Sequence, residues 1–356
     1  MRLLSSILHR VIYPVLGSVG YFHARAVAPV TVITYHGVLP AGYRSDDAFL
    51  DNTLVSEASF RSQLRLLKKH YNVISPERFL RWLGKIEELP ERAVLLTCDD
   101  GLLNHLTTMV PMLQEEELQC LFFVTGSSAG DKLEMLWYVE LYLLLMQAKV
   151  QDQAVRVREI TVPKIPADPG QRRSLWLTLL RSLSQVDAAT RSVFLREAAT
   201  RFGLLPSWKM RYLDDPLLRE RFQLLRLPEL KQLRDAGMTV GAHTLSHPVL
   251  AEQVADLARV EIEECGKRLG ESLGQPVWAL AYPFGDPGSA GEREFKLAAD
   301  AGYQCGFVNV GGVLDRESAR FALPRVHVTA EMSLAVYEAY VSGVHNALRT
   351  RMWLRE

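Results

Sequence analysis

The sequence lacks the paired cysteine spacings that are typical of thiol redox proteins and of zinc-ribbon proteins. It has four cysteines and no C-x-x-C pair. Cys98, Cys120 and Cys305 lie in apolar, strand-like runs, where a free cysteine acts as a small hydrophobe. We therefore expect reduced cysteines and a cytoplasmic chain.

Net charge is also missing. The 356 residues include 41 Lys and Arg against 41 Asp and Glu, so the formal charge is zero. A balanced chain produces no general field for nucleic acid or another strongly anionic partner. We expect no nucleic-acid partner, and the sequence contains neither internal repeats nor a low-complexity tract.

The N-terminus lacks acidic residues before Asp46 and lacks an apolar run long enough to cross a bilayer. Its apolar residues follow a helical stripe that Pro14 interrupts, and His9 and Arg10 break the core of any secretory signal. A basic amphipathic segment over 1–29 fits two interpretations. It lies on a membrane surface, such as the inner membrane, or it packs on the rest of the protein.

The chain does contain a clear alternation of strand and helix patterns. Such a pattern predicts an α/β fold with a parallel sheet that helices cover on both faces. The expected strands are 30–38, 93–98, 120–125, 238–242, 277–281 and 304–308, and the expected helices are 56–70, 76–89, 103–117, 228–236, 252–273 and 290–301. Between them, 126–227 has helical patterns and one short strand candidate at 158–162, which indicates a helical insertion.

Two adjacent carboxylates, Asp99 and Asp100, follow the apolar run 93–98. A solvated turn would explain such a pair, but a solvated Asp-Asp turn does not usually follow directly after a buried apolar run. Two acids in different environments can also take two roles. One binds a metal, and the other serves as a base on a metal-bound water.

Two histidines follow the expected strand 238–242. His243 and His247 are four apart, a spacing that places both imidazoles on one side of a helical turn. Together with one carboxylate they would form a three-ligand site of the catalytic zinc type. The alternative is a pair of histidines that caps a helix near Pro248.

A third stretch, 279–287, ends an expected strand in Tyr-Pro-Phe-Gly. Proline and glycine there force a tight turn, and its exposed N–H groups could stabilise an oxyanion. By itself the stretch is simply a turn.

Together these stretches resemble the NodB-homology polysaccharide deacetylases, carbohydrate esterase family 4. The first motif, usually Thr-Phe-Asp-Asp-Gly, is TCDDG at 97–101. The second, His-Ser/Thr-x-x-His, is HTLSH at 243–247, and the third, Arg-x-Pro-Tyr/Phe, is AYPF at 281–284. The resemblance covers about 30–125 and 228–330.

The resemblance implies a distorted (β/α) barrel that holds one divalent metal, commonly zinc. Asp100, His243 and His247 would be its ligands, Asp99 the general base, and the backbone N–H of Phe284 an oxyanion donor. The reaction would be metal-assisted hydrolysis of an acetamido group on a sugar. The expected organisation is an amphipathic segment 1–29, a barrel 30–345 interrupted by the insertion 126–227, and a tail 346–356.

The chain departs from the family pattern at three places. The motif-three arginine, which usually orients the base, is Ala281, and the Asp-x-x-Asp-Trp motif that supports it is missing. No clear match exists for the general-acid histidine. His36, at the end of the first strand, resembles the acid of the biofilm poly-N-acetylglucosamine deacetylases and is favoured over His327, although either could be structural. Substrate contact or barrel packing would each explain Arg325 and Trp278, and His105 is expected at the surface.

The leading hypothesis is a deacetylase that acts on an N-acetylated glycan, either an exopolysaccharide or its lipid-linked precursor, with peripheral membrane contact through 1–29. One alternative is a non-catalytic glycan-binding or assembly protein on the same barrel. Another is a hydrolase of C–N bonds in a small non-sugar amide.

Overall fold

The computed structural model describes residues 7–312 and 314–353, with side chains up to residue 348. Parts of the expected segments 1–29 and 346–356 therefore lie outside the described residues, at 1–6 and 354–356.

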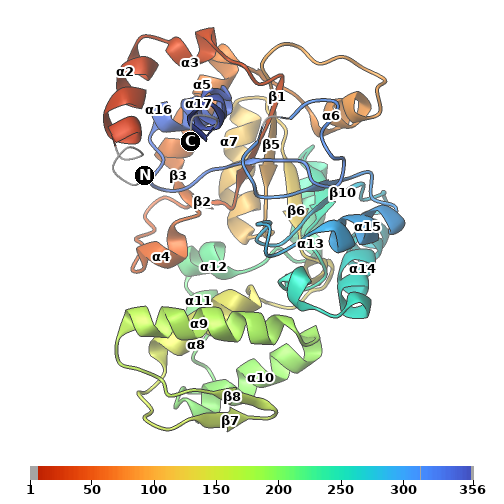
Figure 1. The fold of residues 1–356 in the computed structure, drawn as a ribbon. Coiled ribbons are helices and arrows are strands. Elements are labelled where there is room, and N and C mark those ends of the chain that lie inside the picture. The colour runs from red at the N-terminus through yellow and green to blue at the C-terminus, as the bar shows by residue number, and fades with distance from the viewer. Residues whose placement is uncertain (1–6, 313, 354–356) are drawn as a thin grey trace.

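A curled parallel sheet forms the centre of the molecule (Figure 1). Its spatial order is β11-β10-β9-β6-β5-β1-β12, and β4 pairs with the first residues of β5. The strands are β1 (Val30–Tyr35), β4 (Asn72–Val73), β5 (Ala93–Cys98), β6 (Leu121–Val124), β9 (Thr239–Ala242), β10 (Ala279–Ala281), β11 (Cys305–Phe307) and β12 (Val326–His327). This architecture confirms the predicted α/β class, a distorted (β/α) barrel with an insertion.

Helices cover the outer face of the sheet, and side-chain caps fix where several of them begin. Ser56 and Ser75 each accept a hydrogen bond from a backbone N–H three residues on, which satisfies a donor that a helix start leaves free. The helices are α5 (Glu57–His70), α6 (Pro76–Leu83), the π-helix η2 (His105–Met109) leading into α7 (Val110–Glu115), α13 (Leu227–Asp235), α14 (Ala255–Leu273), α15 (Glu292–Asp300) and α16 (Leu334–Val341).

Strand β5 shows how the sheet directs its side chains. Val94 and Leu96 pack in the outer cluster against the helices, whereas Ala93 and Leu95 pack in the interior cluster, which aromatic residues of α6 close. Because side chains alternate along a strand, Asp99 continues the interior face of β5. Its burial follows from this position.

The barrel is open between β11 and β12, which do not pair as strands. The chain before β12 bridges this seam instead. The Val308 N–H donates to the Leu323 carbonyl at 3.0 Å, and the Arg325 N–H donates to the Val310 carbonyl at 3.1 Å. These bonds hold Arg325 at the seam.

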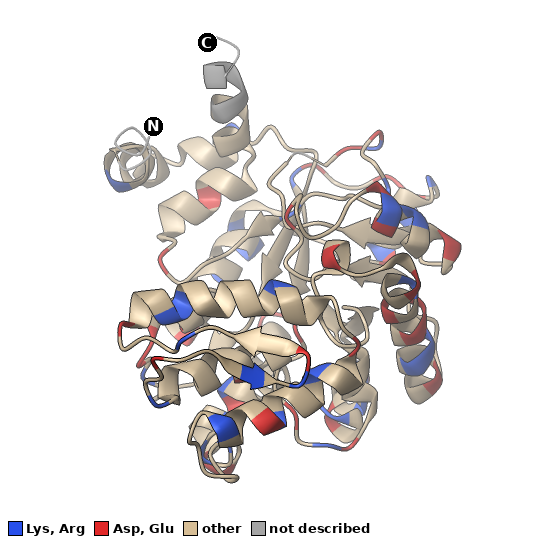
Figure 2. Ribbon diagram, turned by 60° about the horizontal axis from the view of Figure 1, so that its bottom comes forward, with Lys and Arg blue, Asp and Glu red and all other residues tan. Residues whose placement is uncertain are grey.

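The insertion forms a small layer of its own beyond the carboxyl ends of the strands (Figure 1). It contains α8 (Trp137–Gln147), β7 (Val155–Val157), β8 (Ile160–Val162), α9 (Pro169–Ser184), α10 (Ala188–Arg201), α11 (Arg211–Asp214) and α12 (Pro216–Phe222). The single strand expected at 158–162 is wrong in detail, because β7 and β8 form an antiparallel hairpin. Arg158, with φ 53°, makes the turn between them. Charged residues of both signs are spread over this layer (Figure 2).

The N-terminal segment lies at the other end of the barrel (Figure 1). Its elements are the π-helix η1 (Leu8–Ile12), α2 (Tyr13–Ser18) and α3 (Tyr21–Ala24), and they pack on α16 and on α17 (Val344–Trp353). Tyr13 and Phe22 form this contact with Val336 and Ala339. Among the described helices, none has the length and apolar character that crossing a membrane requires.

Short elements complete the described chain. They are β2 (Val38–Leu39), α4 (Ala48–Asp51), β3 (Val55–Ser56), and the 3-10 helices η3 (Gly126–Ala129) and η4 (Leu250–Glu252).

Candidate active site

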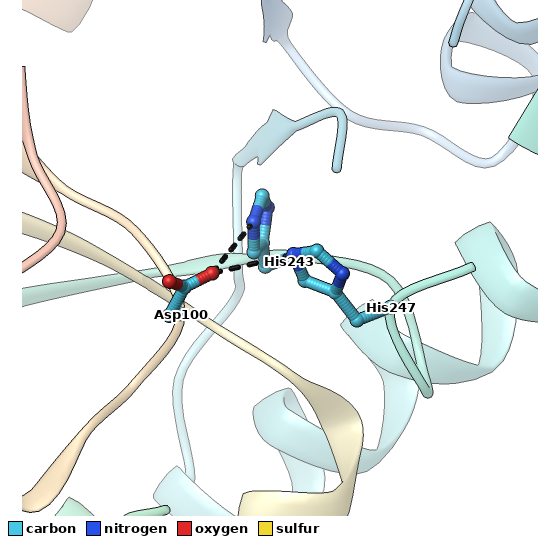
Figure 3. A group of neighbouring side chains, drawn as sticks. All are labelled: Asp100, His243 and His247. Atoms are coloured by element: carbon cyan, nitrogen blue, oxygen red, sulfur yellow. Dashed lines mark ion pairs between the residues drawn. The ribbon is translucent and has the colours of Figure 1, made fainter. Parts of the chain in front are cut away.

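Asp100, His243 and His247 meet at the carboxyl ends of β5 and β9 (Figure 3). The Asp100 Oδ1 atom lies 3.6 Å from His243 Nε2 and 3.2 Å from His247 Nε2. All three side chains are buried, and one ligand atom from each lies within 4.8 Å of the others. The structure thus brings together the three residues predicted as metal ligands.

The backbone after β5 explains why two adjacent acids can face different ways. Asp100 and Gly101 both have positive φ, 85° and 76°, so the chain turns sharply off the strand. A Cβ at position 101 would lie 3.1 Å from the Val124 side chain, which favours glycine at this position in both space and conformation. Asp99 therefore faces the barrel interior while Asp100 faces the histidines.

The histidines lie on a loop, so the helical turn used to interpret their spacing is wrong. Thr244 and His247 both have left-handed conformations, with φ of 60° and 59°. The Thr244 hydroxyl accepts a hydrogen bond from the His247 N–H at 3.0 Å and closes a tight turn. This turn, in place of a helix, brings the two imidazoles to one side.

The donor set fits a divalent cation. His243 Nδ1 lies 2.8 Å from the Ala281 carbonyl, which can only accept, so Nδ1 carries the proton and the Nε2 lone pair faces Asp100. Burial lowers the pKa of His247 and so favours its neutral, metal-binding form. A lone pair facing a carboxylate is unfavourable without a cation, and one carboxylate with two imidazoles is a set that zinc prefers.

Asp99 is held by an arginine that no motif predicted. Arg325 Nη1 donates to Asp99 Oδ1 at 2.7 Å and Nη2 donates to Oδ2 at 2.6 Å. Burial raises the pKa of Asp99, but the charge and hydrogen bonds of Arg325, together with the neighbouring histidines His243 and His36, hold that pKa below its ordinary value. The sequence left Arg325 open between substrate contact and packing, whereas the structure pairs it with the predicted base.

Phe284 follows β10 in a left-handed conformation, with φ 61°. Its ring lies 5.0 Å from the His247 ring, centroid to centroid. Within the described part of the chain, the Phe284 N–H donates no hydrogen bond. The residue predicted as the oxyanion donor therefore lies beside a predicted ligand with its N–H available.

The two candidates for the general acid are neighbours. Strands β1 and β12 pair with Thr34 opposite His327, and the His36 and His327 rings are 4.7 Å apart. Each ring has one buried nitrogen without a partner, His36 Nδ1 and His327 Nε2. Burial and then the neighbouring His36 lower the pKa of His327 to about 3.

Two further predictions can be compared with the structure. His105 was expected at the surface, and this is wrong: η2 turns it inward, where it is fully buried and its Nε2 lies 3.2 Å from the His36 carbonyl. Burial lowers the pKa of His105 to about 4. Trp278 lies at the amino end of β10, packed against the interior cluster, and therefore away from the site.

The histidine loop is braced from both sides. From the barrel, the α14 carboxylate of Glu261 accepts from the Ser246 N–H at 2.7 Å and from the Ser246 hydroxyl. From the insertion, Arg191 of α10 donates to the same hydroxyl, and the Trp137 indole of α8 donates to the His247 carbonyl at 2.9 Å. The insertion therefore forms part of the support of the site.

The chain was compared with known proteins. The sequence model of the family described as polysaccharide deacetylase matches residues 207–306. A 116-residue segment is 26% identical to YxkH of Bacillus subtilis, which carries the name of a polysaccharide deacetylase, and spans 33% of this chain and 40% of that protein.

Solved structures share the fold. The deacetylase PplD of Streptococcus pyogenes, in complex with acetate, aligns with a TM-score of 0.56 at 18% identity, over 89% of this chain and 99% of PplD. IcaB from Ammonifex degensii aligns with a TM-score of 0.55 at 17% identity, over 89% of this chain and 98% of IcaB.

Fold and site together define an α/β-barrel protein with a candidate metal site at the carboxyl ends of its strands. The family model covers the second and third sequence motifs, at 243–247 and 281–284. By these matches the chain is similar to the polysaccharide deacetylase family, whose sequence model covers residues 207–306.

Proposed function

We propose that the chain is a divalent-metal-dependent hydrolase that removes N-acetyl groups from an amino sugar of an exopolysaccharide or its lipid-linked precursor. The observation that carries this proposal is the buried cluster of Asp100, His243 and His247 beside a second carboxylate that Arg325 orients. A divalent cation, most simply zinc, would supply Lewis acidity that polarises the acetyl carbonyl and makes its carbon more electrophilic.

Asp99 is suited to accept a proton. Each oxygen of an ionised carboxylate has two lone pairs, and Arg325 uses one on each oxygen. The lowered pKa keeps Asp99 ionised at neutral pH. The remaining lone pairs can take the proton of the attacking water, and the arginine fixes the direction from which it comes.

Two other groups complete the proposed reaction. The Phe284 N–H would donate to the oxyanion that forms on the acetyl group. His36 would protonate the amine that leaves. The pKa of His327 is too low for a proton donor at neutral pH, and this supports His36 as the acid and His327 as its neighbour.

A membrane role for the N-terminal segment is a further part of the proposal. An exposed apolar residue recurs every four positions, on the side opposite the buried Tyr13: Ile7, Val11, Val15 and Val19. The segment carries basic residues and, in the described helices, no acidic one (Figure 2). An apolar stripe flanked by positive charge favours an anionic lipid surface.

The test is acetate release from N-acetylglucosamine oligomers by the purified chain. We expect turnover that a chelator abolishes and zinc restores. Asp99→Asn should lower kcat by about 10²- to 10⁴-fold, the usual contribution of a general base, whereas Asp256→Asn, at an exposed position on α14, should leave it unchanged.

Other outcomes identify the alternatives. Oligomer binding without acetate release by the wild-type chain would indicate a glycan-binding protein. Hydrolysis of small N-acyl amides in preference to sugars would indicate the non-sugar hydrolase. Turnover that survives both chelation and Asp99→Asn would overturn the proposed chemistry.

A further inference from the structure

The insertion places one aromatic side chain directly at the site. Tyr138 lies in the first turn of α8, and its ring centroid is 4.9 Å from that of His247 and 5.5 Å from that of Phe284. A predicted metal ligand and the predicted oxyanion donor thus both contact a ring from 126–227. No family motif covers this position.

The Tyr138 hydroxyl has no hydrogen-bond partner among the described residues, although its backbone carbonyl accepts from the Trp176 indole at 2.8 Å. The Tyr138 side chain is half-buried, and its hydroxyl is not among the buried polar atoms without a partner, so solvent reaches it. Tyr142, one turn further along α8, is fully buried and donates to Asp47 Oδ2 at 2.5 Å. Unlike the Tyr142 hydroxyl, the Tyr138 hydroxyl is therefore open to a partner from outside the chain.

The chemistry of a phenol makes this hydroxyl a donor. With an ordinary pKa of about 10, a tyrosine is neutral and protonated at neutral pH. Beside two carboxylates, a neutral donor can bind an uncharged polar ligand without adding a charge to the site.

We propose that Tyr138 contacts the substrate: its hydroxyl donates a hydrogen bond to an oxygen of the bound amino sugar, and its ring forms part of the wall against which the sugar lies. This inference rests on the proposed function and deepens it, because the insertion then takes part in substrate selection. The ligand class is a neutral, hydroxyl-rich N-acetylated sugar.

The experiment compares Tyr138→Phe with Tyr142→Phe, which removes a hydroxyl from the same helix. We expect Tyr138→Phe to raise KM for N-acetylglucosamine oligomers about three- to tenfold, the worth of one hydrogen bond, with kcat and metal content nearly unchanged. Tyr142→Phe should leave KM unchanged and act only on thermal stability. A fall in kcat at constant KM, or equal KM shifts in both variants, would overturn the assignment.

A binding measurement separates this inference from the proposed function. Oligomers are titrated into Asp99→Asn and into the double variant Asp99→Asn/Tyr138→Phe, so that no turnover is needed. Three- to tenfold weaker binding in the double variant supports the contact even if the chain releases no acetate. Equal affinities overturn the contact while leaving the hydrolase proposal standing, and absence of binding in both overturns the contact for this sugar class.

Discussion

At the scale of single residues, Arg325 accounts for a departure from the family pattern. The arginine expected at the third motif is Ala281, yet Asp99 still has a two-pronged guanidinium partner. Arg325 reaches it from the seam between β11 and β12, where it also donates to the Thr34 hydroxyl at 3.1 Å. The contact of the motif residue can therefore be supplied from another segment, the one that leads into β12, so its absence at 281 is no evidence of an inactive site.

Removing Arg325 should be costly. Arg325→Ala would leave Asp99 charged and unpaired in the interior, and we expect a loss of about 3–5 kcal/mol in the free energy of unfolding. Arg325→Lys should recover part of this free energy, because a lysine keeps the positive charge but cannot donate two parallel hydrogen bonds to the carboxylate. Urea unfolding measures both, and Arg320→Ala, at an exposed arginine, should cost less than about 1 kcal/mol. A loss that small at Arg325 would contradict its role.

The sequence predicted the residues that its motifs contain but not their partners. Four site residues could be predicted because each follows an expected strand: Asp99, Asp100, His243 and His247. Arg325 and His105 could not be placed, because their surroundings depend on register and on a π-helix. The pairing of Thr34 with His327, which aligns β12 with β1, leaves no local pattern in the chain.

At the scale of elements, the histidine loop depends on the insertion. The loop has no regular structure, and two of its residues adopt left-handed conformations. Its geometry is therefore set by neighbours: α14 holds Ser246 through Glu261, and α8 holds His247 through Trp137. We infer that the insertion tunes the affinity of the site for its cation, in the manner of outer-shell groups in metalloproteins.

Two tryptophans in the insertion permit a matched test. Trp137→Phe removes the donor to the His247 carbonyl, and Trp176→Phe removes the donor to the Tyr138 carbonyl. Each should lower the free energy of unfolding by about 1 kcal/mol. Only Trp137→Phe should weaken zinc binding, by about tenfold or more, as measured by competition with a chromogenic chelator. Unchanged zinc affinity would show that the loop keeps its shape without this contact.

Elements were predicted better than their ends. Strand β5 was placed at 93–98 from its apolar run, and the structure agrees. The strand expected at 30–38 divides into β1 and the short β2, because Gly37, with φ 142°, breaks the run. Of the hairpin β7–β8, only β8 falls within the expected strand 158–162. A three-residue strand has too short an alternation of apolar and polar residues to be recognised.

At the scale of the whole molecule, the N-terminal helices have two apolar faces. One is buried against α16, and the other is exposed, with Val15 and Val19 at 61% and 73% of their full accessibility. Packing on the protein and contact with a membrane, the two interpretations of the sequence, are therefore compatible. The first is observed, and the second remains our proposal.

A vesicle experiment tests the second. Val15→Glu together with Val19→Glu should reduce co-sedimentation with vesicles of half anionic and half zwitterionic lipid by at least tenfold, because two charges would enter the interface. Leu205→Glu, at a leucine of the insertion that is 74% exposed, should bind as the wild type does. Equal sedimentation of all three proteins, or none by the wild type, would count against lipid as the partner.

The placement of the two ends also bears on the length of the substrate. The N-terminal helices precede β1 and lie at the end of the barrel opposite the insertion (Figure 1), whereas the proposed catalytic groups follow the carboxyl ends of the strands. A chain resting on lipid through its first helices would hold the reaction at least one strand away, about 20 Å for β1. A glycan attached at the lipid surface would have to extend over that distance to enter the site. We therefore expect a glycan several residues long, and longer oligomers should be deacetylated faster than the monosaccharide.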